Sequence, residues 1–99
     1  PPTAIFAGND EMAIGVMQAA RNRGLDVPKD LSIVGFDDLP MASRVWPNLT
    51  TVRLPIRDMG RMAAEKLTAA RRGIDPTKLN QPDVLPSLVI RESSAPPRG

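Results

Sequence analysis

The chain has 99 residues, of which 41% are hydrophobic and 24% charged, and its formal net charge is +2. This composition is typical of an ordinary globular protein. The absence of cysteine and histidine excludes disulfides, thiolate or imidazole metal sites and Ser-His-Asp catalysis. Any chemistry must therefore rest on carboxylates, amides, hydroxyls and arginines, and we expect no cofactor and no bound metal.

The sequence also argues against a membrane-spanning protein and against a nucleic-acid-binding protein. Spanning a bilayer takes about 20 consecutive apolar residues, and every apolar run in this sequence is much shorter. No signal-peptide pattern opens the chain. Its three aromatic residues, Phe6, Phe36 and Trp46, are too few for a base-stacking platform. We therefore predict a cytoplasmic protein that does not itself contact DNA.

The first half of the sequence predicts a strand, a helix and a second strand. Apolar runs over residues 3–8 and 31–36 read as short buried strands. A helix is predicted over 11–23, with Gly24 as its left-handed stop. Continuous apolar strands around a helix indicate a mostly parallel sheet with both faces covered, so the fold class is α/β, as a three-layer βαβ arrangement.

The second half predicts one long helix over 56–72, ended by Gly73. Its apolar positions form one stripe, made of Ile56, Met59, Ala63, Leu67 and Ala70. Arg61 and Glu65 can form an i,i+4 ion pair on the opposite side. The other expected segments are a loop over 39–48, a strand over 49–54, a loop over 74–86, a strand over 87–91 and a mobile tail over 93–99.

Polar side chains follow the first two predicted strands, Asn9-Asp10 after one and Asp37-Asp38 after the other. Parallel strands end at the same edge of a sheet, and open α/β sheets bind ligands there. A carboxylate beside an amide suits a ligand rich in hydroxyls, because the carboxylate accepts and the amide donates hydrogen bonds. The alternative is that these residues only cap a helix and start a turn.

A catalytic or metal role for Asp37 and Asp38 is a second alternative. Paired acids at a strand end can hold Mg²⁺ in phosphotransfer domains or act as acid and base in glycosidases. A receiver-type site also needs a lysine at another strand end, whereas Lys78 lies in a predicted loop. We therefore expect no catalytic residue and no enzyme activity.

The first helix is apolar on more than one side, since only Gln18 is strongly polar between Met12 and Ala20, and Ile14 is among its apolar residues. This pattern indicates burial against another domain or subunit, unless the helix merely tolerates one exposed isoleucine. Trp46 is either a loop anchor or an aromatic residue at the ligand rim.

The motifs together resemble one family. The succession AIFAGNDEMAIGVMQAARNRGLDVPKDLSIVGFDD, WPNLTTVRLPIRDMGRMAAEKL and PSLVIRES is similar to the last third of LacI/GalR bacterial transcription regulators, over about residues 3–93. The resemblance implies a periplasmic-binding-protein-like (type I) effector domain, in which two lobes joined by crossovers enclose a small polar ligand such as a sugar.

The resemblance also implies how the chain is divided. Residues 3–53 would belong to the C-terminal lobe, 54–86 would provide a helix and loop of the other lobe, and 87–92 would return as a strand. Family regulators carry a helix-turn-helix that this sequence does not contain, so we expect a fragment that binds DNA only through a missing segment. Its second helix would lack the sheet that it normally covers, which predicts self-association or displacement of residues 56–73.

Site residues follow from the resemblance position by position. Asn9 and Asp37 are the expected ligand contacts. Weaker candidates for the ligand rim are Asp10, Asp38, Trp46 and Ile56. Candidates for a homodimer interface are Ile14, Met17, Gln18, Arg21 and Val45. The predicted function is thus the effector-binding portion of a LacI-type regulator; the alternatives are a periplasmic sugar-binding transport component and a metal-dependent phosphotransfer domain.

Overall fold

The computed structural model describes residues 1–98, which form two compact units. Unit 1 contains Pro1–Arg53 together with the chain from Ser87 onward, and unit 2 contains Leu54–Pro86. The chain therefore leaves unit 1 once, after Arg53, and re-enters it once, at Ser87.

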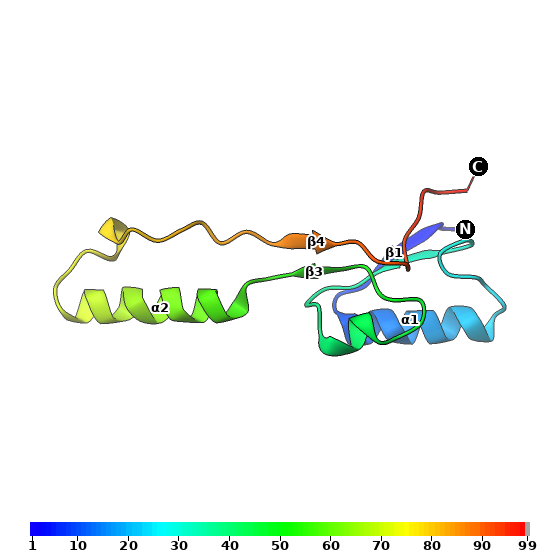
Figure 1. Cartoon of the computed structure of the whole chain (residues 1–99), viewed down its shortest axis with the longest axis horizontal. Helices are drawn as coiled ribbons and strands as arrows, with labels where there is room; N and C mark the ends of the chain where they lie inside the picture. Colours follow the sequence, from blue (N-terminus) through cyan, green and yellow to red (C-terminus); the bar gives the residue numbers. More distant parts are fainter. Residues whose placement is uncertain (99) are drawn as a thin grey trace. The chain divides into compact units, whose positions relative to one another are not determined.

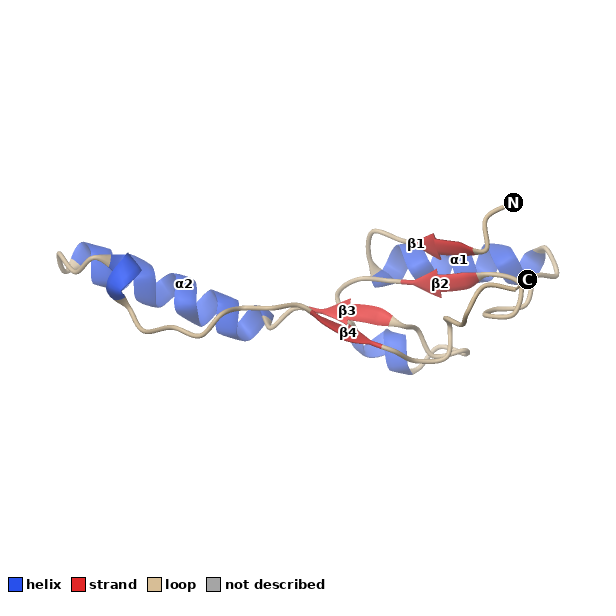
Figure 2. Ribbon diagram, turned by 90° about the horizontal axis from the view of Figure 1, so that it is seen from above, coloured by secondary structure: helices blue, strands red, loops and turns tan. Residues whose placement is uncertain are grey.

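The strands of the described chain are short and all lie in unit 1 (Figure 2). Strand β1 (Ala4–Phe6) pairs in parallel with β2 (Ser32–Val34). Strand β3 (Thr51–Arg53) pairs antiparallel with β4 (Ser87–Val89). Each strand lies within the range that the sequence predicts for it.

Backbone hydrogen bonds join these two pairs in parallel. The Gly35 N–H donates to the Thr50 carbonyl at 2.9 Å, and the Asp37 N–H donates to the Val52 carbonyl at 2.9 Å. The two-stranded sheets β1-β2 and β3-β4 are thus joined through a parallel bridge between Val34 and Thr50, and β4 runs antiparallel to β3. This arrangement confirms the predicted α/β fold with mostly parallel strands.

Helix α1 (Asp10–Asn22) covers one face of this arrangement (Figure 1). Its inner side contributes Ala13, Met17 and Ala20 to a hydrophobic core that also contains Ile33 and Leu49. The prediction that both strands are buried on both faces is wrong for β1: Phe6, whose side chain alternates away from the helix side, is 67% exposed.

Residues next to the two ends of α1 explain why the helix begins and ends there. Asn9 caps the first turn, and Asp10 and Glu11 place negative charge beside its free N–H groups. Gly24 adopts φ +73° directly after the helix, a conformation that glycine reaches without strain. The predicted helix and its glycine stop are confirmed.

The C-terminal segment is fixed where a mobile tail was expected, so that expectation is wrong for residues 93–95. Ser93 is fully buried; its hydroxyl accepts from the Thr50 N–H at 2.8 Å and donates to the Ile33 carbonyl at 2.5 Å. The Ala95 N–H donates to the Ser32 hydroxyl at 3.0 Å. These bonds join Ser93 both to Ile33 of β2 and to Thr50, the residue that precedes β3. Gly99, the last residue of the expected tail, lies outside the described residues.

Unit 2 consists of helix α2 (Ile56–Arg71), a short 3-10 helix (Pro76–Lys78) and the extended chain that follows. The helix buries Met62 and Ala69, whereas the predicted apolar stripe points outward, with Ile56 61% and Leu67 74% exposed. Periodicity thus locates the helix correctly and misidentifies the side that is covered within this chain. The Arg61–Glu65 pair is confirmed at 3.0 Å.

Two loops contain additional helical turns. A 3-10 helix (Pro40–Ser43) lies within the first predicted loop and Pro76–Lys78 within the second. Both begin with proline, whose fixed φ suits a first helical turn. In the described part of the chain, none of the helices has the length and apolar character needed to span a bilayer.

Candidate functional site

The two expected ligand contacts lie at one edge of the sheet in unit 1. Asn9 follows β1 and Asp37 follows β2, and these strands run in parallel. The backbones of the two turns are bonded directly: the Asp10 N–H donates to the Phe36 carbonyl at 2.9 Å. The structure therefore brings Asn9 and Asp37 to the same edge, and both side chains are partly exposed there.

Asn9 has a structural role that leaves its amide group available. Its Oδ1 accepts from the Met12 N–H at 2.8 Å, as an N-cap does. Its Nδ2 group forms no hydrogen bond with any residue between positions 1 and 98. The two interpretations of this residue are thus compatible, since one side chain can cap the helix and donate to a ligand.

Asp37 is held in an unusual backbone conformation, with φ +115°. Residues with a Cβ atom avoid this region, and the strain of such positions is often retained where function requires it. The Asp37 N–H is fixed by the Val52 carbonyl, whereas its carboxylate has no hydrogen-bond partner among the described residues. It is a fixed, partly exposed acceptor at the edge of the sheet.

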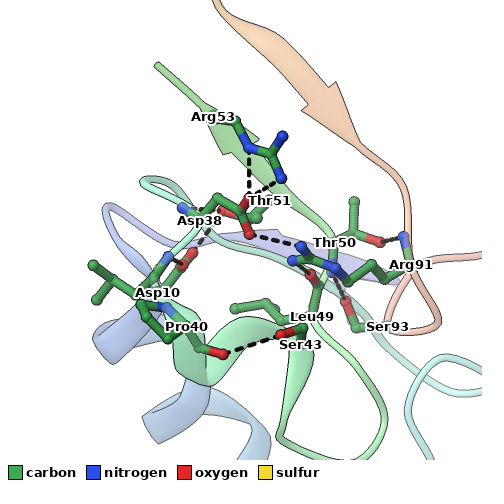
Figure 3. Close-up of polar contacts among 11 residues, drawn as sticks. Asp10, Asp38, Pro40, Ser43, Leu49, Thr50, Thr51, Arg53, Arg91 and Ser93 are labelled. Carbon is green, nitrogen blue, oxygen red and sulfur yellow. Dashed lines mark hydrogen bonds and ion pairs between the residues drawn. The ribbon is translucent and has the colours of Figure 1, made fainter. Parts of the chain in front are cut away.

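Asp10, a weaker rim candidate, is instead part of the protein interior. Its side chain is fully buried and accepts hydrogen bonds from the Thr51 hydroxyl at 2.6 Å and the Leu39 N–H at 2.7 Å (Figure 3). A Cβ atom at Gly35 would collide with this carboxylate, so the glycine makes room for it. The prediction that Asp10 lines the ligand rim is wrong, because both of its oxygens serve the fold.

Asp38, the second acidic rim candidate, is also committed to the fold. Its Oδ2 lies 2.6 Å from Nη2 of Arg53, and its Oδ1 lies 2.7 Å from Nη2 of Arg91; the carboxylate is 7% exposed (Figure 3). Burial raises the pKa of Asp38, but the hydrogen bonds and charges of Arg91 and Arg53 outweigh it and leave the pKa below the usual 3.8. Asp38 is therefore not a ligand contact of the kind predicted.

The same pairing argues against the phosphotransfer alternative. A divalent cation at Asp37 and Asp38 would have to displace two guanidinium groups that already neutralise one of the two carboxylates. Among residues 1–98, no cluster of three or more acidic side chains has a geometry suited to a metal ion.

Trp46 lies at the wrong end of α1 for a ligand rim. Its carbonyl accepts a hydrogen bond from Arg21 in the last turn of the helix at 3.0 Å. Asn9 stands at the other end, and the 12 intervening residue steps span about 18 Å of helix. The rim role predicted for Trp46 is therefore wrong. Ile56, the remaining rim candidate, opens α2 in unit 2.

The interface candidates form one surface at the C-terminal half of α1. A shallow cavity of about 160 Å³ is lined by Ile14, Met17, Gln18, Arg21, Val45 and Trp46. Met17 is 6% exposed and belongs to the core, so it is not the accessible contact that was expected. Ile14 also packs against the core and is only partly buried, which accounts for its apolar character without a partner.

Two residues of this region, Arg53 and Arg91, were not singled out by sequence reasoning. Both bind Asp38, from positions that are 15 and 53 residues away along the chain. The only signal was that each lies near the end of a predicted strand, which placed them near the sheet but not near Asp38.

Known proteins resemble the chain over almost its whole length. A family model described as a periplasmic binding protein-like domain matches residues 1–94. The chain belongs to the family of periplasmic binding protein-like domains. The transcriptional regulator DegA of Bacillus subtilis is 50% identical over 96 residues, which are 96% of this chain and 28% of DegA. The chain thus spans little more than a quarter of that relative's length.

Solved structures of this family have the same fold. A LacI-family regulatory protein from Chloroflexus aggregans is 48% identical, with a TM-score of 0.80 over 95% of this chain and 33% of that protein. A LacI-family regulator from Arthrobacter sp. FB24, solved in complex with lactose, is 36% identical, with a TM-score of 0.77 over 94% of this chain and 35% of that protein. The predicted resemblance to the effector domain of LacI-type regulators is confirmed.

Proposed function

We propose that the chain is the effector-binding portion of a LacI-type transcription regulator, in which Asn9 and Asp37 hydrogen-bond a small polyhydroxylated ligand. The observation that carries this proposal is the bond between the Asp10 N–H and the Phe36 carbonyl, which fixes the two turns side by side. The role is binding rather than catalysis, because the neighbouring acids Asp10 and Asp38 are occupied by the fold.

The chemistry of the edge fits a sugar. The Asn9 amide can donate and the Asp37 carboxylate can accept, so adjacent hydroxyls of one ring can be bound by both. The strained conformation of Asp37 supports a functional role, since glycine would adopt it more easily. The lactose complex of the Arthrobacter regulator supports the same ligand class.

The partners follow from the same reasoning. A second copy of the chain is proposed to contact the surface that contains Ile14, Gln18, Arg21 and Val45. Operator DNA would be bound by a helix-turn-helix outside these 99 residues, as the names of the HTH-type relatives suggest for those proteins. Such a regulator would act in the cytoplasm, where ligand binding shifts the population of DNA-binding states.

The test uses a chimera in which this chain replaces the segment that it matches in the Arthrobacter regulator, with lactose as the probe. Asp37→Asn should weaken lactose binding by about 1.5–3 kcal/mol, because a charge-assisted hydrogen bond is lost. Asn9→Ser should also weaken it while preserving the helix cap, since serine caps about as well as asparagine. Isothermal titration calorimetry measures both effects.

Glu11→Gln is the matched control. Glu11 is an exposed carboxylate in the first turn of α1, beside the same edge, and its neutralisation should leave lactose affinity unchanged. Equal affinity in the parent chimera, Asp37→Asn and Asn9→Ser would remove both residues from the ligand site and end the proposal.

A further inference from the structure

The turn that carries Asp37 contains two consecutive left-handed residues. Asp37 has φ +115° and Asp38 has φ +55°. Side chains with a Cβ atom disfavour this region, and a turn with two such residues persists only if its surroundings hold it.

The contacts come from β3 and from the chain after β4. The Asp38 N–H donates to the Thr51 hydroxyl at 3.3 Å, which adds to the bond between the Asp37 N–H and β3. The Asp38 carboxylate accepts from Nε and Nη2 of Arg53 at 2.7 and 2.6 Å, and from Nη2 of Arg91 at 2.7 Å (Figure 3). Both carboxylate oxygens are thus occupied by guanidinium groups.

The two arginines lie where the chain leaves unit 1 and where it returns. Arg53 is the last residue of β3 and directly precedes unit 2. Ser87, the first residue after unit 2, is paired with Arg53 in the β3–β4 ladder, and Arg91 follows that strand. A single carboxylate therefore holds both connecting strands, β3 and β4, to the turn after β2.

Arg91 is the more firmly held of the two partners. Its Nη1 donates to the Leu49 carbonyl at 2.9 Å, its backbone N–H donates to the Thr50 hydroxyl at 2.9 Å, and its side chain is 16% exposed. The Arg53 side chain is 58% exposed and faces solvent. Arg91 thus holds Asp38 to the partly buried part of unit 1. Arg53, the exposed last residue of β3, binds the same carboxylate.

We propose that Asp38 is a positioning residue that fixes the turn presenting the Asp37 carboxylate and couples this turn to both connecting strands. This inference rests on the proposed function, because it takes Asp37 as the ligand contact. In this arrangement ligand at Asp37 orders β3 and β4, and because coupling free energies are reciprocal, ordered strands increase the affinity for ligand. An ion pair that only stabilised the fold would have neither effect.

Amide hydrogen exchange of the 99-residue chain tests the ligand-free part. Asp38→Asn should accelerate exchange at Asp37 and over Thr51–Arg53 by roughly tenfold or more relative to the β1–β2 amides, because their local opening no longer breaks the ion pairs. Arg53→Gln, which keeps the Arg91 contact, should give a smaller acceleration and serves if Asp38→Asn fails to fold. The control is Asp30→Asn, which removes a different ion pair of unit 1, with Arg98.

Lactose titration of the chimera tests the coupling. Asp38→Asn should weaken binding roughly five- to hundredfold, whereas Asp30→Asn should not change it. If Asp37→Asn weakens binding and Asp38→Asn does not, the positioning role is overturned while the proposed function stands. If Asp37→Asn has no effect, the inference is overturned, and if Asn9→Ser has none either, the proposed function fails as well. Exchange at Asp37 that is the same in Asp38→Asn, Arg53→Gln and the control would overturn the inference without any ligand.

Discussion

Unit 1 and unit 2 contain one long helix each, and the two helices differ in how their apolar side chains are buried. In unit 1, α1 packs Ala13, Met17 and Ala20 into a core with the sheet. In unit 2, α2 buries Met62 and Ala69, and its apolar stripe faces outward. Helical periodicity is equally clear in the two sequences, so the difference depends on whether this chain supplies a sheet for the stripe to cover.

The two units also differ in whether their polar side chains are buried or exposed. Unit 1 buries Asp10, Thr51 and Ser93, all of them hydrogen-bonded to residues distant in sequence. Unit 2 has its ion pairs on the helix surface, between Arg61 and the exposed acids Asp58 and Glu65. Buried polar groups specify a unique arrangement because each lost bond is costly, whereas exposed pairs add little. We therefore expect most of the specific structure to reside in unit 1.

The same substitution in each unit gives the largest contrast. Leu49→Ala removes a fully buried side chain of unit 1 and should lower the free energy of unfolding by about 2–5 kcal/mol. Leu67→Ala removes a side chain that is 74% exposed and should change it by less than about 0.5 kcal/mol. Urea unfolding followed through the NMR amide signals of each unit measures both values. Similar losses would mean that the stripe of α2 is covered within the chain.

A smaller effect than that of Leu49→Ala is expected for the pH dependence of the stability of unit 1, which should depend on Asp38. The folded pKa of Asp38 is lowered, so its contribution is fully present above the unfolded pKa near 3.8 and is lost as pH falls through the folded value. Asp38→Asn should cost about 1.5–3 kcal/mol at pH 6 and progressively less below pH 3.8, since the wild-type carboxylate is then being protonated.

Urea unfolding at several pH values between 2 and 6 checks this dependence. The control is Asp30→Asn, which removes the ion pair with Arg98. Apart from the loss of that pair, its stability should fall between pH 6 and pH 2 by as much as that of the wild type. A constant difference between Asp38→Asn and wild type at every pH would show that the charge of Asp38 does not contribute.

The contrast also explains what the sequence could predict. Apolar runs and their polar ends predicted the parallel strands and the common edge of Asn9 and Asp37, because both depend on local patterns and one rule about parallel strands. The separate roles of Asp37 and Asp38 could not be predicted. They depend on the left-handed turn and on Arg53 and Arg91, which are distant in sequence.

Two other errors have the same origin. The position of Trp46 depends on the path of an irregular loop, which no periodicity specifies. The covered side of α2 depends on the patternless segment that follows it: Gln81 Nε2 donates to the Met62 carbonyl at 3.2 Å and to Glu65 at 2.9 Å. Local patterns thus predicted elements, and contacts distant in sequence decided which face of each element is used.

The smallest expected effect is on self-association through α2. Its exposed stripe, with Ile56, Met59 and Leu67, favours pairing between copies of the chain, because apolar surface is removed from water. Leu67→Glu should weaken this association by about 1 kcal/mol, roughly fivefold in the dissociation constant, since part of one leucine is no longer buried. Sedimentation equilibrium at increasing concentration measures the change. Gln18→Arg, on the α1 surface that we propose contacts a second copy, should weaken the association less than Leu67→Glu if the α2 stripe is the larger contact, and the opposite order would place the larger contact on unit 1. A compact monomer at high concentration would show that the stripe of unit 2 needs no partner.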